Sequence, residues 1–360
     1  MPDSTVTAEL PLCVVGGGNI GARHATVALT AKGVRLTAVA EPDETRRNDL
    51  RQQGLPVVAS LADVPPETAA AVIATPTPDH CQSGLTALEN GWAVLVEKPV
   101  TQTLEDSERL CRASEQAGLA LFTGHHRRSH PSTALMRDQL PEIGRLVAVQ
   151  GLWSLRKHDS YYDVKWRREK GAGPILTNLS HELDLLRLMA GEIEEITALT
   201  SSATRKLEIE DTCAMTIRFA SGALGTFLIS DAGASPWAFE AATGENPGIA
   251  WTGQDSVRFI GTQGALSFPS LTRWGAGEPG EIEWSKPLQK TPGPTLTCVD
   301  PIEVQLERFA RAMNGQNEPL LATGRDGQAT LAATVATIRA AETGQPVGPK
   351  SLLNFQGVQT

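Results

Sequence analysis

The sequence predicts an α/β chain in two parts, a doubly wound parallel sheet followed by an α+β part built on an open, largely antiparallel sheet. Three observations support this prediction. A glycine-rich turn follows a short apolar strand near the start, strand and helix patterns alternate up to about residue 124, and consecutive strand-like segments follow. We therefore expect domains at residues 1–125 and 126–360, with late helices that can pack back on the first domain.

The first elements form one unit. An apolar strand, Leu10–Val15, runs into Gly-x-Gly-x-x-Gly at Gly16–Gly21. A helix-like run, Ala22–Lys32, comes next, and a second strand, Val34–Ala40, ends at Glu41. A strand, this glycine pattern, a helix and an acidic residue about 20 positions further on are the parts of a dinucleotide-binding βαβ unit of the Rossmann type. A glycine-rich turn that binds nothing would not require this context.

Each glycine of the pattern has its own physical reason. Gly16 lets the chain turn sharply out of the strand, Gly18 lets a pyrophosphate approach the backbone, and Gly21 lets the helix pack closely on the strand. The N–H groups at the helix start, at Asn19 and Ile20, are expected to bind the phosphates with help from the helix dipole.

Glu41 bears on which dinucleotide binds. Its carboxylate can accept hydrogen bonds from both ribose hydroxyls of NAD, and it would repel the 2′-phosphate of NADP. Arg46 and Arg47 lie nearby; they either favour NADP or belong to a solvated helix face within the charged run Glu41–Arg51. The charge argument favours NAD over NADP.

The rest of the chain gives a succession of elements. Parallel strands are expected at Leu36–Ala40, Ala70–Ala74, Ala93–Val96 and Leu119–Thr123, with helices at Asp79–Asn90 and Leu104–Ala117. Later strands are expected at Arg145–Leu155, Ile193–Ser201, Asp211–Phe219, Gly225–Ser230, Ser256–Gly261 and Ala265–Phe268. Later helices are expected at Ser132–Gln139, Leu176–Met189, Pro301–Met313 and Asp326–Thr343. Asp231–Gly253 reads as a long Gly/Pro-rich loop, which is either functional or a surface excursion.

Composition restricts the class of protein. With 360 residues, 41% of them hydrophobic, the chain can form two well-packed domains. A net charge of −9 argues against broad binding to nucleic acid or to anionic membranes. The five cysteines are scattered and odd in number, no apolar signal core precedes residue 10, and no window is apolar enough to span a membrane. We expect a cytoplasmic protein with reduced thiols.

Lys98 is the first candidate for chemistry. The strand Trp92–Val96 runs into Glu97-Lys98-Pro99, and ligands of open α/β sheets bind beyond the carboxyl ends of the strands. A lysine beside a nicotinamide can hydrogen-bond a substrate hydroxyl and take or return its proton. Taken alone, a lysine at this position is more often a surface lysine.

His181 is the second candidate. It follows Gly171-Ala172-Gly173 on a helix where Leu179, Leu183 and Leu186 line one face. Helical spacing places Thr177, His181 and Asp184 on another face. A histidine there can exchange a proton near neutral pH, or it can be a core histidine satisfied by Asp184 or by a backbone carbonyl.

Taken together, these segments resemble the glucose–fructose oxidoreductase/inositol dehydrogenase (Gfo/Idh/MocA) family over nearly the whole chain. The matching stretches are Gly16–His24, Ala74–His80, Glu97–Pro99, Gly124–Arg128, Trp166–Arg167, Gly171–Gly173, His181-x-x-Asp184 and Thr323–Gly327. Glu-Lys-Pro at its place in the fold is the most specific of them.

The resemblance implies hydride transfer between NAD(P) and a secondary alcohol of a sugar, cyclitol or related ring. It implies a C-terminal sheet that often serves oligomerisation, so that we expect a homodimer or homotetramer. Carried over by position, Lys98 and His181 are the catalytic residues. The cofactor would be lined by Thr75, Pro76, His80, Glu97 and His126, with Trp166 and Arg167 near its nicotinamide end. The substrate would contact Lys98, Arg127, Tyr161, Thr177, Asn178, His181 and Asp184.

This chain departs from the family pattern at two positions. Many members have an aspartate where it has Thr177, and many have an asparagine where it has His126. Without that carboxylate His181 would rely on Asp184, and Asn178 can position a hydroxyl but cannot act as a base. Two alternatives to a dehydrogenase therefore stay open: an NAD-dependent glycoside hydrolase that works by transient oxidation and elimination, and a non-catalytic NAD-binding sensor.

Two further sets of side chains are candidates for ligand binding. His125, His126 and His130 lack the spacing and the carboxylate of a usual metal site, so no metal is expected. A basic and aromatic set is either a substrate pocket for an acidic ring or an ion-pair network. Its members are Arg127, Arg128, Trp153, Lys157, Tyr161, Tyr162, Trp166, Arg167 and Arg168.

Overall fold

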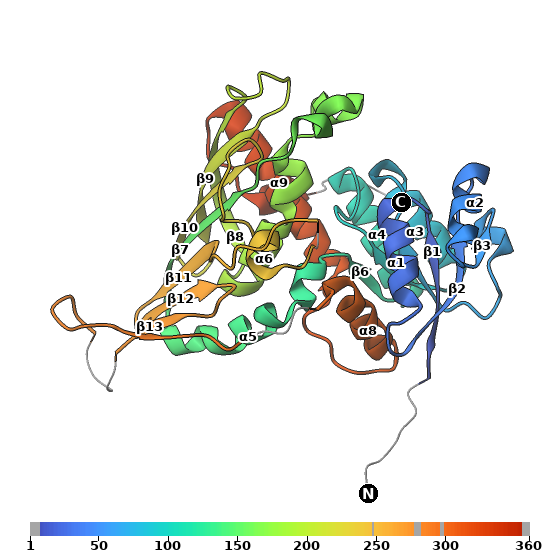
Figure 1. Cartoon of the computed structure of the whole chain (residues 1–360), viewed down its shortest axis with the longest axis horizontal. Helices are drawn as coiled ribbons and strands as arrows, with labels where there is room; N and C mark the ends of the chain where they lie inside the picture. Colours follow the sequence, from blue (N-terminus) through green and yellow to red (C-terminus); the bar gives the residue numbers. More distant parts are fainter. Residues whose placement is uncertain (1–7, 247, 277–281, 296–298, 355–360) are drawn as a thin grey trace, which may run out of the picture. The chain divides into compact units, whose positions relative to one another are not determined.

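The computed structural model describes residues 8–246, 248–276, 282–295 and 299–354 (Figure 1). The chain divides into two compact units. Unit 1 comprises Met1–His130 and Val299–Gln328, and unit 2 comprises Pro131–Cys298 and Ala329–Thr360. Unit 1 thus takes in a late segment that a boundary after residue 125 assigns to the second domain.

Unit 1 is built on a mostly parallel sheet with strands in the order β15-β6-β5-β4-β1-β2-β3. In that order their bounds are Ala322–Thr323, Leu121–Thr123, Ala93–Val96, Ala70–Ile73, Leu10–Val15, Val34–Ala40 and Val57–Val58. β15 pairs antiparallel with β6, and the other neighbours pair in parallel. Because β1 lies between β4 and β2, the strand order reverses there, and the carboxyl ends of β1 and β4 form the edge where such sheets bind ligands.

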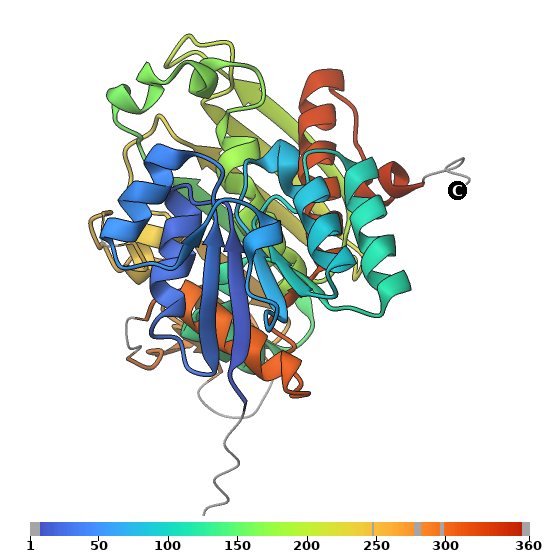
Figure 2. The same cartoon turned by 90° about the vertical axis from the view of Figure 1, so that its right-hand side faces the viewer.

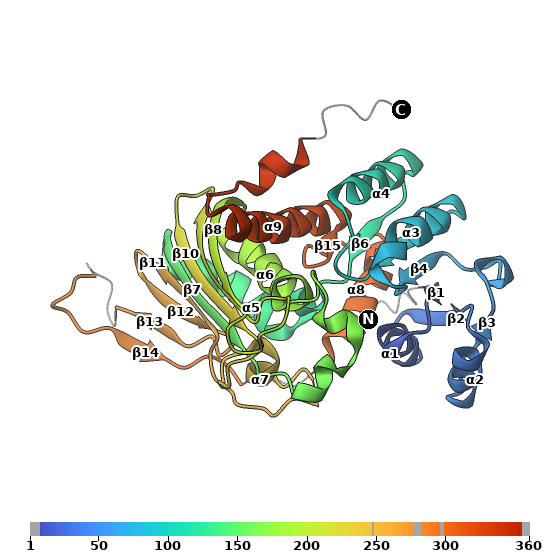
Figure 3. The same ribbon diagram turned by 90° about the horizontal axis from the view of Figure 1, so that it is seen from above.

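Helices cover both faces of this sheet. On one face lie α1 (Asn19–Ala28) and α2 (Glu44–Gln52), and on the other α3 (His80–Glu89) and α4 (Leu104–Ala117) (Figures 2 and 3). The strands between them are apolar on both sides; Val14 and Val72, for example, are fully buried. The late helix α8 (Pro301–Met313) adds Leu306 and Phe309 to the same core. The predicted doubly wound parallel sheet is confirmed.

Helix α1 differs from its prediction at both ends. The pattern gave 22–32, whereas the helix runs from Asn19 to Ala28. It starts earlier because the Gly18 carbonyl already accepts the Ala22 N–H, which makes Gly18 the N-cap. It ends earlier because the N–H groups of residues 30 and 31 both turn back to the Val27 carbonyl in a tightened last turn.

Unit 2 is built on a largely antiparallel sheet in the order β14-β13-β12-β11-β7-β10-β9-β8. In that order the strands span Gln289–Thr291, Arg273–Gly275, Gly264–Phe268, Val257–Gly261, Leu146–Ser154, Leu224–Ser230, Thr212–Phe219 and Ile193–Ser201. β10 pairs with β9 in antiparallel fashion and with β7 in parallel fashion. The six strands expected after residue 145 are confirmed within one residue at each end. The short β13 and β14 were not predicted.

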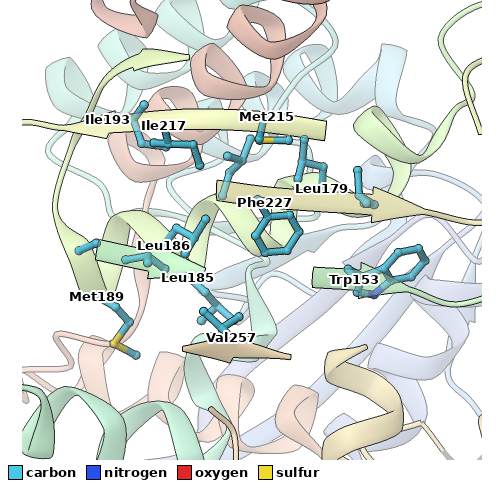
Figure 4. Packing of buried hydrophobic residues seen from close by; sticks show 14 of the residues in the cluster. Trp153, Leu179, Leu185, Leu186, Met189, Ile193, Met215, Ile217, Phe227 and Val257 are labelled. Atoms are coloured by element: carbon cyan, nitrogen blue, oxygen red, sulfur yellow. The ribbon is translucent and has the colours of Figure 1, made fainter. Parts of the chain in front are cut away.

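One face of this sheet carries helices α5 (Pro131–Gln139), α6 (Ser180–Ala190) and the unit 2 part of α9 (Gly324–Thr343) (Figure 3). The core lies between them and the sheet (Figure 4). Phe227 on β10 lies over Gly151 on β7, where a Cβ would be 2.2 Å from the phenyl ring. Gly151 is therefore needed for this strand pair to pack.

Two expectations are corrected in this core. Trp153 is 1% exposed, lies in the hydrophobic cluster and donates its indole N–H to Glu240, so its ring has no face free to stack on a sugar. The long loop expected at Asp231–Gly253 contains a short helix, α7 (Phe239–Thr243). Phe239 is buried against Phe268, at 5.7 Å between ring centroids, so this part of the segment is core rather than surface excursion.

Candidate functional site

The glycine turn of unit 1 has the geometry of a phosphate cradle. Gly16 has φ +97°, and a Cβ there would lie 2.8 Å from the backbone of Ala74 and Thr75. A Cβ on Gly21 would lie 1.9 Å from the Gly16 carbonyl oxygen, so the helix meets the strand here at a distance that only glycine allows. Gly18 is different, because a Cβ there would meet nothing within 4 Å.

The open space at Gly18 lies at the start of α1, where no side chain caps the helix. Asn19 is exposed and Ile20 is half-buried. Uncapped N–H groups beside a backbone without a Cβ are what a pyrophosphate requires. The residues present therefore fit a dinucleotide.

Glu41 stands at the end of β2 with its carboxylate held in place. Its Oε2 accepts the Gly17 N–H at 2.7 Å, and its Oε1 accepts the Asp43 N–H at 2.8 Å. Arg47 donates from Nη1 to the carbonyls of Glu41 and Pro42, at 3.0 and 2.6 Å. Arg47 thus stabilises the turn after β2, and the Glu41 carboxylate is fixed beside the glycine turn.

His80 links the ends of β4 and β5. It is 2% exposed, and its Nε2 and Nδ1 each lie 2.9 Å from a carbonyl oxygen, those of Thr75 and Pro99 respectively. Burial lowers the pKa of His80 against the opposing effect of the two carbonyls. The neutral ring has one N–H and donates to one carbonyl at a time. Thr75 and Pro76 keep partial or full exposure beside it.

Glu97 is buried beside α1 and is the first residue after β5. His24 on α1 lies with Nε2 2.7 Å from Glu97 Oε1, and the Lys98 N–H donates to Glu97 Oε2 at 3.1 Å. Burial would raise the pKa of Glu97, but the hydrogen bond and charge of His24, with the charges of His126 and Lys98, lower it to about 2. The carboxylate is therefore ionised beside the candidate catalytic lysine.

The turn His126–Ser129 lies next to this group. Burial, with a smaller contribution from the charge of Arg127, lowers the pKa of His126 to about 3, so its imidazole is neutral at physiological pH. Arg127 is 2% exposed, and Arg128 forms an ion pair with Asp326 at 3.5 Å. The arginines of this turn are interior residues of the chain, not an open basic surface.

In unit 2 the segment before His181 contains a π-helical turn. Ile175–Leu179 is π-helical and α6 begins at Ser180, whereas the prediction was one α-helix from 176 to 189. The wider turn changes the angular relation between Thr177 and His181 that α-helical spacing assumed. Glu210 Oε1 accepts the N–H of Ile175 and closes the start of this turn. A Cβ on Gly173 would lie about 2 Å from the Glu210 carboxylate, so a larger residue there would displace the Glu210 side chain from this contact.

Thr177 and Asn178 contact a half-buried lysine, Lys157. Thr177 Oγ1 lies 3.0 Å from the Gly173 carbonyl and 2.9 Å from Asn178 Oδ1. Lys157 donates from Nζ to Asn178 Oδ1 at 2.9 Å and pairs with Asp231 at 3.3 Å. Burial lowers the pKa of Lys157, while Asp231 opposes that shift. The Lys157 ammonium thus lies next to Asn178, directly after the position at which many members of the family have an aspartate and this chain has Thr177.

The remaining candidate site residues of unit 2 differ in their exposure and in their contacts. The Arg167 guanidinium lies 4.1 Å from the centre of the Tyr161 ring, and Trp166 is 54% exposed. Asp184 is 1% exposed and accepts a hydrogen bond from Thr330 at 3.3 Å. His181, one turn earlier on α6, is 6% exposed.

Sequence reasoning missed three residues. His24 lay inside a quoted motif without a role, Glu210 gave no local signal, and Lys157 appeared only in the basic set. Each acts on a residue distant in the sequence, so no local pattern revealed the pair. That basic and aromatic set is not one cluster within one unit, since Arg127 and Arg128 belong to unit 1 and the others to unit 2.

The described residues include neither a metal-binding cluster nor a membrane-spanning helix. Within the described ranges, no group of three or more His, Cys, Asp or Glu side chains is arranged to hold a metal ion. Over the same ranges, no helix combines the length and apolar character that crossing a membrane requires.

Comparison with known proteins defines the family. The model described as "Oxidoreductase family, NAD-binding Rossmann fold" (Gfo/Idh/MocA) matches residues 11–125, and the Gfo/Idh/MocA C-terminal domain model matches residues 139–267. A 1,5-anhydro-D-fructose reductase from Ensifer adhaerens is 30% identical over 290 residues, which are 78% of this chain and 79% of that protein. The chain belongs to the Gfo/Idh/MocA oxidoreductase family, and its first domain is an NAD-binding Rossmann domain.

Two other similarities add detail. A 1-carboxy-3-chloro-3,4-dihydroxycyclohexa-1,5-diene dehydrogenase from Comamonas testosteroni is 28% identical over 220 residues, 58% of this chain and 55% of that protein. The solved structure of an oxidoreductase from Agrobacterium radiobacter, in complex with NAD+, L-tartaric acid and magnesium, aligns with a TM-score of 0.79 at 18% identity. The alignment covers 96% of this chain and 100% of the Agrobacterium chain, which shows that the two proteins share a fold.

Proposed function

We propose that this oxidoreductase is an NAD-dependent dehydrogenase that oxidises a secondary alcohol of a sugar, cyclitol or related ring. The observation that carries the proposal is the arrangement in unit 1, where Lys98 follows directly on a buried, ionised Glu97 at the edge that holds the glycine turn. The names of the two relatives, a sugar reductase and a cyclic-diol dehydrogenase, support the substrate class.

NAD is proposed over NADP because of Glu41. Its carboxylate is fixed by two backbone N–H groups, so it cannot swing away from an incoming 2′-phosphate without breaking both bonds. Arg47, the residue that could neutralise such a phosphate, is already bonded to two carbonyls. Asn19, Ile20 and Gly18 would hold the pyrophosphate.

The chemistry assigned to the chain's own residues is proton handling and orientation. When bound, NAD supplies the hydride acceptor. Lys98, in its neutral amine form, binds the reacting hydroxyl and takes its proton to become an ammonium, and His181 positions or relays that proton. Thr75, Pro76, His80, Glu97, His126, Trp166 and Arg167 are proposed to line the cofactor. Arg127, Tyr161, Thr177, Asn178 and Asp184 are proposed on the substrate side.

An acidic ring is the proposed substrate subclass. Lys157 and Arg167 both approach the Tyr161 ring, at 4.9 and 4.1 Å from its centre, and Arg167 donates from Nη1 to the Tyr161 carbonyl at 3.0 Å rather than to a carboxylate. A guanidinium without a carboxylate can take one from a ligand. The carboxylated ring in the name of the Comamonas relative agrees with this reading.

A homodimer or homotetramer is proposed through the sheet of unit 2. On β8 and β10, residues that alternate with core positions point away from the helices and are exposed; Leu199 is 75% and Leu228 38% exposed. A hollow of about 610 Å³ lies on this face, lined in part by Leu152 and Leu199. Exposed apolar area of this kind marks an association surface.

We also propose a cytoplasmic location, in keeping with four described cysteines that are unpaired and buried; Cys298 lies outside the described residues.

The test is a screen of neutral and acidic ring alcohols with NAD and NADP side by side, run on the wild type and on Lys98→Ala. The proposal expects NADH formation that the variant loses while it still binds NAD. Release of an aglycone without NADH would instead identify the glycoside hydrolase. Binding of NAD with no turnover of any compound would favour the sensor. Hits among neutral compounds alone would remove the acidic subclass.

A further inference from the structure

A chain of hydrogen bonds runs from the dinucleotide-binding helix to Lys98. His24 lies on α1 and is completely buried, with Nε2 2.7 Å from Glu97 Oε1. The other oxygen of that carboxylate, Oε2, accepts the backbone N–H of Lys98 at 3.1 Å. The sequence order of these residues gives no hint of the link, because 73 positions separate His24 from Glu97.

We propose that His24 is a positioning residue for Lys98, which acts by holding the Glu97 carboxylate in the orientation that receives the Lys98 N–H. The inference rests on the role given to Lys98 in the proposed function. It adds a residue that touches neither substrate nor cofactor in that scheme and acts through Glu97 alone.

The surroundings of Glu97 explain why a partner is needed. The carboxylate side chain is 8% exposed, and a Cβ on Gly124 would lie 3.0 Å from Oε1, so water has little access to it. The titratable groups that face it are His24 from α1, His80 from α3, His126 from the following turn and its neighbour Lys98. His24 supplies a side-chain hydrogen bond as well as charge, whereas Lys98 acts on it through charge, and His126 does so only where it is protonated at low pH. An ionised carboxylate that loses such a bond inside a protein reorients or takes up a proton.

The tautomer of His24 provides a matched pair of variants. Its Nδ1 is buried and has no hydrogen-bond partner within the described residues, so the ring donates from Nε2. A glutamine amide nitrogen reaches the position of Nε2, and an asparagine amide nitrogen reaches only that of Nδ1. His24→Gln therefore keeps a donor for Glu97, and His24→Asn removes it at similar polarity.

The experiment compares these two variants with Thr26→Ala, a change on the exposed side of the same helix. Three quantities are measured: kcat, the Kd for NAD, and the pH dependence of the Lys98 amide chemical shift in protein without ligand. His24→Asn should lower kcat about ten- to a hundredfold, the order of loss when a catalytic group is slightly misplaced. Its Kd for NAD should stay within about threefold, because the interaction lost acts on turnover rather than on binding.

The amide shift reports on Glu97 independently of turnover. In His24→Asn the Lys98 amide should titrate at a higher pH than in the wild type, because burial then outweighs the remaining charges around Glu97. His24→Gln and Thr26→Ala should resemble the wild type in all three measurements. A purely structural role of His24 would change stability but would not move this titration.

Two results would overturn the inference. One is a His24→Asn variant that matches Thr26→Ala in kcat and titration; the other is a His24→Gln variant as impaired as His24→Asn, which would make ring shape the cause. If His24→Asn does not fold, Glu97→Gln tests the same link, and an unchanged kcat there contradicts it. Failure of the proposed function has another signature, namely no Lys98-dependent turnover while the Lys98 amide still responds to His24→Asn.

Discussion

Alanine substitutions at Gly18 and Gly21 separate binding from folding. Gly18 has φ −61°, which any residue adopts, and an added Cβ meets nothing within 4 Å. Gly18→Ala should therefore change the free energy of unfolding by no more than about 1 kcal/mol, with the weaker N-cap and the stiffer unfolded chain offsetting each other. An added Cβ on Gly21 lies 1.9 Å from the Gly16 carbonyl oxygen, so the helix must shift by more than 1 Å, at a cost of about 1–3 kcal/mol or more.

The two variants should show opposite patterns for NAD. In Gly18→Ala the methyl group occupies the space assigned to the pyrophosphate, so the Kd should rise at least about tenfold, equivalent to roughly 1.4 kcal/mol. Urea denaturation followed by circular dichroism gives the stability, and calorimetric titration with NAD gives the Kd. A stable Gly18→Ala variant that binds NAD as tightly as the wild type would refute the assignment of this space.

Three further predictions follow from the same structure. Because the pKa of Glu97 falls from 4.5 to about 2 on folding, its ionised form contributes about 3 kcal/mol that is complete above pH 4.5 and disappears as the pH falls toward 2. The difference in unfolding free energy between wild type and Glu97→Gln should shrink over that range; a difference independent of pH contradicts this linkage. Glu41→Ala should weaken NAD binding and improve NADP binding, measured as the ratio of the two Kd values, and an unchanged ratio removes Glu41 from the selection. Leu199→Asp should lower the molar mass measured by light scattering, whereas Leu29→Asp, at an exposed leucine of unit 1, should not; equal masses exclude the sheet face as an interface.

Local sequence patterns were sufficient to predict most of the fold. The βαβ unit was predictable because its strand, glycine turn and acidic end lie within 32 residues, and each part has a short-range cause. The six later strands were predictable because inward and outward residues alternate, as in Thr212–Phe219. The two-residue strands β3 and β15 were missed because they have too few positions for a period to show.

The site was less accessible to sequence reasoning because its contacts are long-range. The π-helical turn before His181 has no distinctive composition, and its closing partner, Glu210, is 35 positions away. Trp153 was grouped with a basic and aromatic set that forms either a substrate pocket or an ion-pair network, because the sequence cannot show that the indole faces the core. The motif from Gly16 to His24 pointed to the cofactor, but only the folded chain showed His24 bonded to Glu97.

The most direct test of the nicotinamide site is a crystal structure of the chain with NAD. The pyrophosphate should lie over Gly18 on the N–H groups of Asn19 and Ile20, with the adenosine ribose on Glu41 and the Lys98 ammonium facing the nicotinamide ring. NAD absent from the glycine turn, or a Lys98 ammonium directed into bulk solvent in that complex, would contradict the proposed dehydrogenase.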